Sequence, residues 1–383
     1  MNDKIKIGID ASNIRLGGGL AHLIELINNL DLQKHDISSV VVWGSNQLLS
    51  SLNSYDWLQK INSSFLNKGF FHRFIWQRFI FPKNSINAKC DILFIPGGIF
   101  YGKNIPYVTM CQNMQVFEKT EMNREGISFI WLRLKILQIR QTKTLQGSNG
   151  VIFLSKHSKN FIKENYPKLN HLNSIIIPHG VHKVKKKLVH KESLINSKIS
   201  ILYVSTVKQY KHQWNVVEAV YNLREKGYDI DLNLIGGGDK KAINRMYKAI
   251  NFNEKYKDSI QFHGNIDHIK LLKIYSQNDL FIFSSTCESF GISLVEAMKS
   301  GLPIACSSYG PLPEILRDGG IYFDPLSPFS IENSLERLIR EKNTRLILSK
   351  KARKYSQTYR WKNCSNDTLN FIAKCYQQTR KDK

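Results

Sequence analysis

The chain has 383 residues, of which 42% are hydrophobic and 11% aromatic, enough to build two ordinary domains and to exclude a disordered chain. Its net charge of +24 suits a phosphate-bearing substrate, an anionic membrane or nucleic acid, or else reflects a lysine-rich composition. The six cysteines form no C-x-x-C pair and have no histidine at zinc-ligand spacing, which argues against zinc and against disulfides. No apolar run reaches the roughly 18 residues of a membrane-spanning helix. Because a strand pattern begins at once, we expect a cytoplasmic protein without a signal peptide.

Short β-branched runs alternate with helical patterns along the chain, an order that predicts parallel sheets covered by helices on both faces. The first series of expected strands is 5–10, 39–43, 91–96, 107–110, 151–154 and 174–178. The second series is 200–205, 229–235, 260–263, 280–283, 303–306 and 320–323. Apolar residues at helical spacing predict helices at 20–30, 214–226 and 292–300. The segment 127–145 has apolar residues all round a helix and is predicted to be buried.

A polar and basic stretch without periodicity separates the two series of strands. We therefore expect an N-terminal domain over 1–182, a linker over 183–198, a C-terminal domain over 199–354 and a final segment over 355–383. Each domain is expected to hold a doubly wound parallel sheet. In this class of fold the ligand is expected between the domains, at the carboxyl ends of the strands.

The segment 284–306 carries the most specific pattern of the chain. An expected strand ends in a loop that contains Glu288, Gly291 opens a helix, and Glu296 follows on that helix. The free amides and the positive dipole end of a helix N-terminus bind pyrophosphate, and glycine lets the backbone approach it closely. The two carboxylates are then placed to hold a sugar and a ribose on either side of the phosphates. Taken as isolated residues, they would instead be a surface loop and a solvated helix face.

This segment resembles the signature of retaining glycosyltransferase family 4, which runs S-x-x-E-x-F-G-x-x-x-x-E-A-M-x-x-G-x-P. The residues that agree are Ser285, Glu288, Phe290, Gly291, Glu296, Ala297, Met298, Gly301 and Pro303. The resemblance implies the GT-B fold, in which two Rossmann-like domains face each other across a cleft. It also implies that Glu288 is catalytic and that the donor contacts Ser289, Phe290, Gly291, Ile292 and Glu296. Residues 355–383 resemble the family's final helix, which crosses back to the N-terminal domain.

A glycine-rich loop and a lysine extend the resemblance over nearly the whole chain. Gly17, Gly18 and Gly19, between the first strand and the first helix, are similar to the family's phosphate-binding loop, although such a run is often only a flexible turn. Lys211 takes the place of the lysine that neutralises the donor diphosphate, and Lys208 is a second candidate cation.

The sequence departs from the family pattern in three segments. Thr206 stands where arginine is usual and Ser205 where glycine is usual, so that one cation of the diphosphate site is lost. Gln112 falls on a histidine position of the N-terminal domain, where its amide can hydrogen-bond a sugar hydroxyl but cannot act as an acid or base. Tyr309 replaces a glycine before Glu314, which is expected near the site.

The resemblance implies a retaining, metal-independent transferase that moves a sugar from a nucleotide-sugar to a saccharide acceptor in surface-polysaccharide synthesis. No cofactor and no metal are expected, because Lys211, the helix opened by Gly291 and the glycine-loop amides would balance the leaving diphosphate. A nucleotide-sugar 2-epimerase of the same fold and a non-catalytic sugar-nucleotide binder are alternatives. A nucleic-acid-binding protein is a third, although the basic residues are dispersed and no nucleic-acid motif is present.

Residues 65–83 of the N-terminal domain are dense in aromatics interleaved with Lys and Arg. Phe71, Phe74, Ile75 and Phe79 share one face of the expected helix, which suits an interfacial helix on an anionic leaflet. Many of the aromatics in this segment must also pack in the core. We predict peripheral attachment to the inner face of the plasma membrane and a lipid-linked acceptor.

Overall fold

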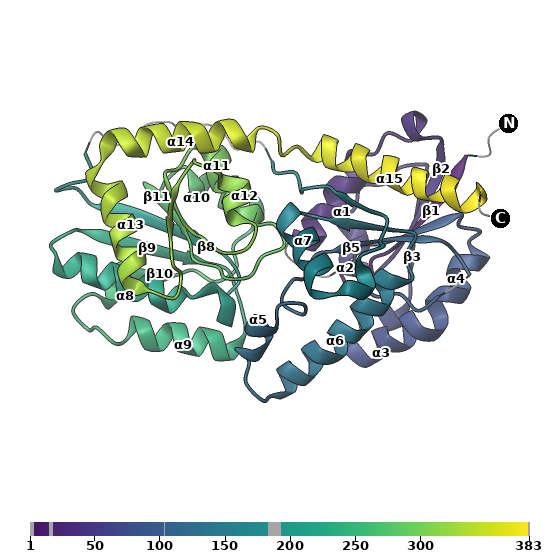
Figure 1. The fold of residues 1–383 in the computed structure, drawn as a ribbon, viewed down its shortest axis with the longest axis horizontal. Helices are drawn as coiled ribbons and strands as arrows, with labels where there is room; N and C mark the ends of the chain where they lie inside the picture. Colours follow the sequence, from purple (N-terminus) through teal and green to yellow (C-terminus); the bar gives the residue numbers. More distant parts are fainter. Residues whose placement is uncertain (1–3, 15–17, 103, 183–192, 382–383) are drawn as a thin grey trace. The chain divides into compact units, whose positions relative to one another are not determined.

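The computed structural model describes residues 4–14, 18–102, 104–182 and 193–381. The chain forms two compact units, each with one sheet (Figure 1). Unit 1 comprises Met1–Phe117, Phe129–Gly180 and Arg360–Lys383, and unit 2 comprises Glu118–Ser128 and Val181–Tyr359. Of the expected linker, residues 183–192 lie outside the described residues, and the rest belongs to unit 2.

Unit 1 contains a seven-stranded parallel sheet. Its strands lie in the order β3 (Leu58–Asn62), β2 (Ile37–Gly44), β1 (Ile5–Asp10), β4 (Ile92–Ile95), β5 (Tyr107–Cys111), β6 (Gly150–Phe153) and β7 (Ser174–Ile176). Its main helices are α1 (Gly18–Asn28), α6 (Phe129–Gln146), α7 (Lys156–Asn165) and α15 (Trp361–Lys381). Shorter helices are α2 (Asn46–Ser50), α3 (Phe70–Ile75), the π-helix η3 (Trp76–Ile80) and α4 (Phe81–Asn87).

Unit 2 contains a six-stranded parallel sheet. Its order is β10 (Ile260–Phe262), β9 (Ile230–Ile235), β8 (Ile199–Val204), β11 (Leu280–Phe283), β12 (Ile304–Ser307) and β13 (Ile321–Phe323). Its helices are α5 (Lys119–Asn123), α8 (Gln213–Glu225), α9 (Lys240–Ile250), α10 (His268–Tyr275), α11 (Ile292–Ser300), α12 (Leu312–Leu316), α13 (Pro328–Arg340) and α14 (Lys342–Ser356). Both sheets therefore confirm the predicted doubly wound α/β class.

The central strands are apolar on both faces because helices cover both sides of each sheet. Val40, Val41, Val42 and Trp43 of β2 are each no more than 1% exposed, and the four residues of β11 are equally buried. Such continuous apolar runs were readable in the sequence. Strand β3 was not predicted, because Leu-Gln-Lys-Ile-Asn is mostly polar and lies at the edge of its sheet.

The predicted burial of 127–145 is wrong. In α6 only Leu134, Thr144 and Leu145 are buried, so the helix rests on unit 1 along one narrow side. Its outward stripe is apolar, with exposed fractions of 81% for Phe129, 50% for Leu132, 41% for Ile136 and 57% for Ile139. An apolar all-round pattern usually marks a buried helix, but here one side of the helix packs and the opposite side stays exposed.

The aromatic segment 65–83 divides between the core and the surface. Trp76 and Phe81 are buried in a cluster with Trp43, whereas Phe71 is 67% and Phe79 58% exposed. Of the four residues expected on one face, Phe71 and Phe79 are exposed and Phe74 and Ile75 are partly exposed, and the π-helix turn that begins at Trp76 separates Phe79 from the other three. Part of the segment is therefore core and part is surface.

Candidate active site

The carboxyl ends of β8 and β11 adjoin in the sheet of unit 2. The connection from β8 leads to β9 on one side, whereas that from β11 leads to β12 on the other, so this is the point where the strand order reverses. Ligands of doubly wound folds bind at this point. Lys208 and Lys211 follow β8, and Glu288 follows β11. The fold thus brings together three predicted site residues that lie up to 80 positions apart.

Hydrogen bonds to its carbonyl oxygen anchor Lys211, and its ammonium group contacts the loop that carries Glu288. Its carbonyl oxygen accepts hydrogen bonds from Tyr203 Oη at 2.5 Å and from Ser284 Oγ at 2.7 Å. Its Nζ forms an ion pair with Glu288 Oε1 and lies 4.9 Å from the centre of the Phe283 ring. The two charged side chains are only 8% and 14% exposed. Removal of either partner would leave a largely desolvated charge without compensation.

Gly291 precedes α11 in a conformation that only glycine adopts readily. Its φ is 106°, and a Cβ at this position would lie 3.2 Å from Leu312 Cδ2. The turn places the N-terminus of α11 directly after the Glu288 loop. Ser289 and Ile292 are partly exposed there, whereas Phe290 is buried and packs edge-on against Tyr359. Of the predicted donor contacts, Phe290 therefore lies in the packing behind the loop.

Glu296 is buried in α11, so the alternative of a solvated helix glutamate is wrong. Its side chain is 5% exposed, and Oε1 lies 2.7 Å from His268 Nε2. Its other oxygen, Oε2, accepts a hydrogen bond from Tyr275 Oη at 2.9 Å. Two fixed partners hold the carboxylate in one orientation. Its remaining lone pairs then point in defined directions, which is what acceptance of hydrogen bonds from two neighbouring hydroxyl groups requires.

Close backbone packing supports the loop that carries the lysines. A Cβ at Gly236 would lie 2.1 Å from Ser205 O, and one at Gly238 would lie 2.1 Å from Val207 O. Only glycine fits at these two positions. Thr206, at the position of the missing arginine, is exposed, and Lys208 is partly exposed. The glycines after β9 are therefore structural.

Residues outside the predicted set also border this site. Glu118 and Cys287 share a side-chain hydrogen bond near Glu288, and burial raises the pKa of Glu118 to about 7. Sequence reasoning missed Glu118, His268 and Tyr275 because each belongs to a segment without a recognisable motif. Burial of an ionisable residue beside a known loop, which only the structure shows, is the signal that identifies them.

The remaining predicted residues lie in unit 1. Gly18 and Gly19 form the first turn of α1, while Gly17 lies outside the described residues. A Cβ at Gly19 would lie 3.4 Å from Gln112 Oε1, so the glycine loop and the end of β5 adjoin. Gln112 Nε2 lies 2.9 Å from Met110 Sδ, which makes a weak hydrogen bond. Near them, burial raises the pKa of Asp10 at the end of β1 to about 6.

Residues 185–355 match the family model of glycosyl transferases group 1. This part of the chain is similar to that family. O-antigen chain mannosyltransferase B of Escherichia coli is 28% identical over 111 residues, which are 29% of this chain and 29% of that protein. The chain matches only part of its curated relatives, 29% of the length of this mannosyltransferase and 43% of the length of a glycosyltransferase from Methanocaldococcus jannaschii.

Two solved structures show the fold of the whole chain. Sucrose-phosphate synthase from Thermosynechococcus elongatus has a TM-score of 0.74 at 16% identity, covering 99% of this chain and 100% of that one. Alr3699/HepE from Anabaena, in complex with UDP and glucose, has a TM-score of 0.70 at 15% identity, covering 97% and 100%. The group 1 glycosyl transferase domain is therefore the second half of a GT-B fold.

Proposed function

We propose that this chain is a retaining glycosyltransferase that takes a sugar from a nucleotide-sugar without a metal ion. The observation that carries the proposal is the Lys211–Glu288 ion pair at the carboxyl edge of the sheet, beside the N-terminus of α11. A phosphate-binding cation, a sugar-binding carboxylate and free helix amides are the three parts that such a donor needs. The UDP and glucose bound by Alr3699/HepE agree with a donor of this class.

In the proposed reaction the bond between the anomeric carbon and the diphosphate breaks, the acceptor oxygen bonds to the same face, and the proton of the acceptor hydroxyl passes to the leaving diphosphate. Negative charge develops on the leaving diphosphate, where Lys211 Nζ and the first amides of α11 stabilise it. Glu288 then exchanges its ion pair with Lys211 for hydrogen bonds from the sugar hydroxyls. Glu296, fixed by His268 and Tyr275, accepts hydrogen bonds from the ribose. No protein nucleophile is required.

We propose that Gln112 and the amides of Gly18 and Gly19, in unit 1, also take part in the transfer. The amide of Gln112 is neutral at every pH, so it positions a hydroxyl and moves no proton. The name of the Escherichia coli relative supports a role in surface-polysaccharide synthesis with a saccharide acceptor.

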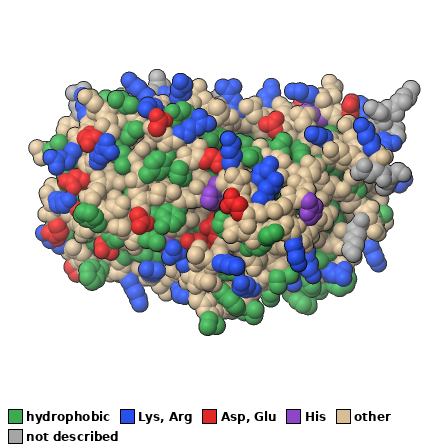
Figure 2. All heavy atoms as spheres, viewed as in Figure 1, with side chains coloured by type: hydrophobic (Ala, Val, Ile, Leu, Met, Phe, Trp, Pro, Cys, Tyr) green, Lys and Arg blue, Asp and Glu red, His purple; other side chains and the backbone are tan. Residues whose placement is uncertain are grey.

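We further propose that unit 1 binds the anionic inner face of the plasma membrane and takes a lipid-linked acceptor. No helix within the described ranges has the length and apolarity needed to cross a bilayer. Exposed hydrophobic side chains and basic residues gather over α3 and α6 at the lower edge of Figure 2. The two helices adjoin, because the guanidinium of Arg140 lies 4.7 Å from the centre of the Phe74 ring. Apolar side chains flanked by Lys and Arg favour an interfacial position.

A groove next to this surface suits the lipid-linked acceptor. It has a volume of about 320 Å³ and is lined by Arg78, Phe79 and Lys83 from the aromatic segment and by Phe100 and Tyr101. Two cations together with an apolar lining match a phosphate joined to an isoprenoid or acyl chain.

The proposed transfer is tested by a thermal-shift panel of nucleotide-sugars, followed by analysis of the products formed with the stabilising donor. A matching donor raises the melting temperature, because it binds only the folded chain. Glu288→Gln should keep this stabilisation while transfer falls about 100-fold. Free sugar 2-epimer formed without acceptor would favour the epimerase alternative. Stabilisation by single-stranded nucleic acid and by no nucleotide-sugar would refute the proposal.

A further inference from the structure

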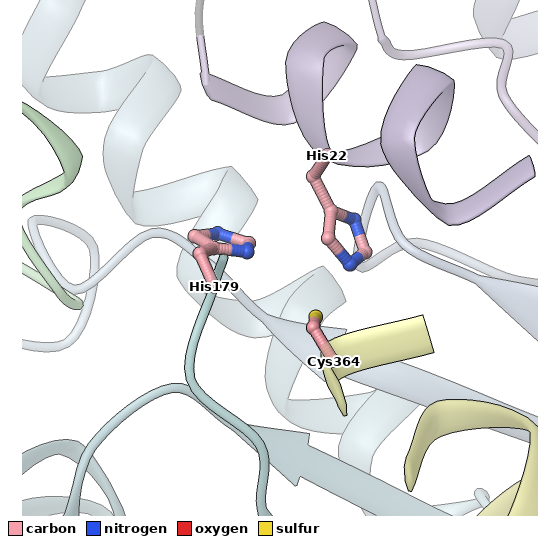
Figure 3. Close-up of side chains that lie close together, drawn as sticks. All are labelled: His22, His179 and Cys364. Atoms are coloured by element: carbon pink, nitrogen blue, oxygen red, sulfur yellow. The ribbon is translucent and has the colours of Figure 1, made fainter. Parts of the chain in front are cut away.

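One buried cluster of unit 1 has no part in the proposed transfer. It consists of His22 on α1, His179 after β7 and Cys364 on α15 (Figure 3). One ring nitrogen of each histidine and the Sγ atom of the cysteine all lie within 4.8 Å of one another. Figure 3 shows the three side chains converging from three different segments. Two imidazoles and a thiol are a common ligand set for zinc-class ions.

The burial of the cluster adds a second, independent observation. His22 is 0% exposed, and neither of its ring nitrogens has a hydrogen-bond partner among the described residues. A buried imidazole N–H or nitrogen lone pair without a partner lowers the stability of the folded state. In native proteins such groups are therefore usually satisfied by a bound ion or water. His179 and Cys364 are each 4% exposed, so the space between the three groups is closed to bulk solvent.

We propose that His22, His179 and Cys364 bind one divalent ion of the zinc class. Nitrogen ligands lie about 2.0–2.1 Å and thiolates about 2.3 Å from zinc, which sets the ligand atoms roughly 3.5 Å apart in a tetrahedral site. The three atoms lie within 4.8 Å of one another, so side-chain rotation would have to close the remaining distance to this spacing. Binding replaces the thiol proton of Cys364, which leaves to solvent, with the metal–sulfur bond. A water molecule or another group supplies the fourth ligand.

The location of the cluster indicates a structural role. The ion would tie the first helix of unit 1 to its last helix and to the segment that ends at Gly180. The same helices already touch, since Ser365 Oγ donates a hydrogen bond to Leu26 O at 2.9 Å. Next to the cluster, a Cβ at Gly180 would lie 2.2 Å from Trp361 N, so the backbones meet closely there. An ion at this junction would stabilise unit 1 against loss of α15.

Cobalt titration of the metal-stripped full-length chain tests the site. The wild type should bind one equivalent of Co²⁺, with a thiolate-to-metal charge-transfer band that zinc abolishes by competition. Cys364→Ser should lose that band, whereas Cys375→Ser should keep it. Cys375 is a matched control, because it is buried on the same helix and has no place in the cluster. Absence of stoichiometric binding, or an unchanged band in Cys364→Ser, would overturn the proposal.

A second measurement covers the case in which the variants do not fold. X-ray absorption of the zinc-loaded wild type should show one sulfur and two imidazole ligands, and a shell of oxygen alone would overturn the assignment. Zinc at about 100 times its Kd should also raise the melting temperature of the wild type by about 5 °C. The donor loops lie in unit 2, so failure of these tests would leave the proposed transfer untouched.

Discussion

The two units share a sheet topology but differ in what their central strands lead into. In unit 2, the loop after β8 carries Lys208 and Lys211, and the loop after β11 carries Glu288. In unit 1, the corresponding connection after β1 contains Arg15, which lies outside the described residues, and leads to Gly18 and Gly19 in the first turn of α1. Among the described residues, the carboxyl edge of the sheet in unit 2 therefore carries paired charges, whereas that of unit 1 carries Asp10 and the backbone amides of the glycine turn.

This difference shows how each unit deals with a desolvated carboxylate. Glu288 is held beside Lys211, and an ion pair lowers the cost of its burial. Among the described residues, Asp10 of unit 1 accepts hydrogen bonds from Ser12, and burial raises its pKa to about 6. Unit 2 therefore holds a fixed lysine charge that can pair with an anionic ligand, whereas Asp10 of unit 1 is a carboxyl group without a paired cation among the described residues. Lys211 of unit 2 is therefore expected to contribute most to the binding of a diphosphate.

The largest effect is expected from Lys211→Ala. If Lys211 is the main cation on the leaving group, this variant should lose about 100- to 1000-fold in kcat, in line with the loss of one preorganised donor. Lys208→Ala is the matched control, because Lys208 lies on the same loop but forms no ion pair with a described residue, and this variant should lose less than tenfold in kcat. Steady-state kinetics with the donor identified by thermal shift measures both.

If Lys208→Ala lost more activity than Lys211→Ala, Lys208 would be the main cation on the leaving diphosphate, and the ion pair of Lys211 would not identify the catalytic lysine. Because Lys211→Ala also leaves Glu288 without its partner, the melting temperature of each variant must be recorded. The double variant Lys211→Ala/Glu288→Gln removes that unpaired charge and should remain as inactive as the single one.

Glu296→Gln comes next, with an expected loss of about 10- to 100-fold in kcat/KM for the donor. Glutamine keeps the shape of the side chain but replaces one hydrogen-bond acceptor with a donor, which disfavours the ribose hydroxyls. Glu332→Gln is the control, since Glu332 on α13 is equally buried and also has both oxygens engaged, by Lys226 and Asn222. Equal loss in both variants would mean that Glu296 acts only through stability.

Most of this architecture was readable in the sequence because buried parallel strands are continuous apolar runs. The strand at 280–283 and the helix at 292–300 have the bounds that were expected. The edge strand β3 was missed because its residues are largely polar, and pairing with β2 rather than burial makes it a strand. Hydrophobic patterns therefore predict the elements that are buried in the core. They do not predict an edge strand whose conformation depends on pairing with its neighbour.

The candidate site divides in the same way. Glu288, Gly291 and Glu296 fall in one motif, and local spacing alone places them together. The partners that fix Glu296, His268 and Tyr275, lie 28 and 21 residues upstream and share no period with it. The His22–His179–Cys364 cluster was missed for the same reason, since absence of ligand spacing excludes only ligands that are close in sequence.

A smaller effect is expected in membrane binding, which should depend on the surface of unit 1 and not on that of unit 2. Phe71 on α3 of unit 1 and Phe329 on α13 of unit 2 are both 67% exposed. Loss of one inserted aromatic ring should weaken binding to anionic vesicles about tenfold, so Phe71→Ser should bind weakly and Phe329→Ser normally. Co-sedimentation at low and high salt measures this. Equal binding by Phe71→Ser and by the wild type would contradict the assignment to α3.

The smallest effect is expected when metal ions are removed. Lys211 and the amides of α11 hold the charge that a cation would otherwise balance, so EDTA should change the initial rate of transfer at 25 °C less than twofold. The control is the melting temperature of the same sample, which should fall if the ion at the His22–His179–Cys364 cluster is withdrawn. A strict requirement for added magnesium or manganese would show that the fixed charges of unit 2 do not suffice. An unchanged rate with a lowered melting temperature would instead show that catalysis depends on the fixed charges of unit 2 and that the metal ion stabilises unit 1.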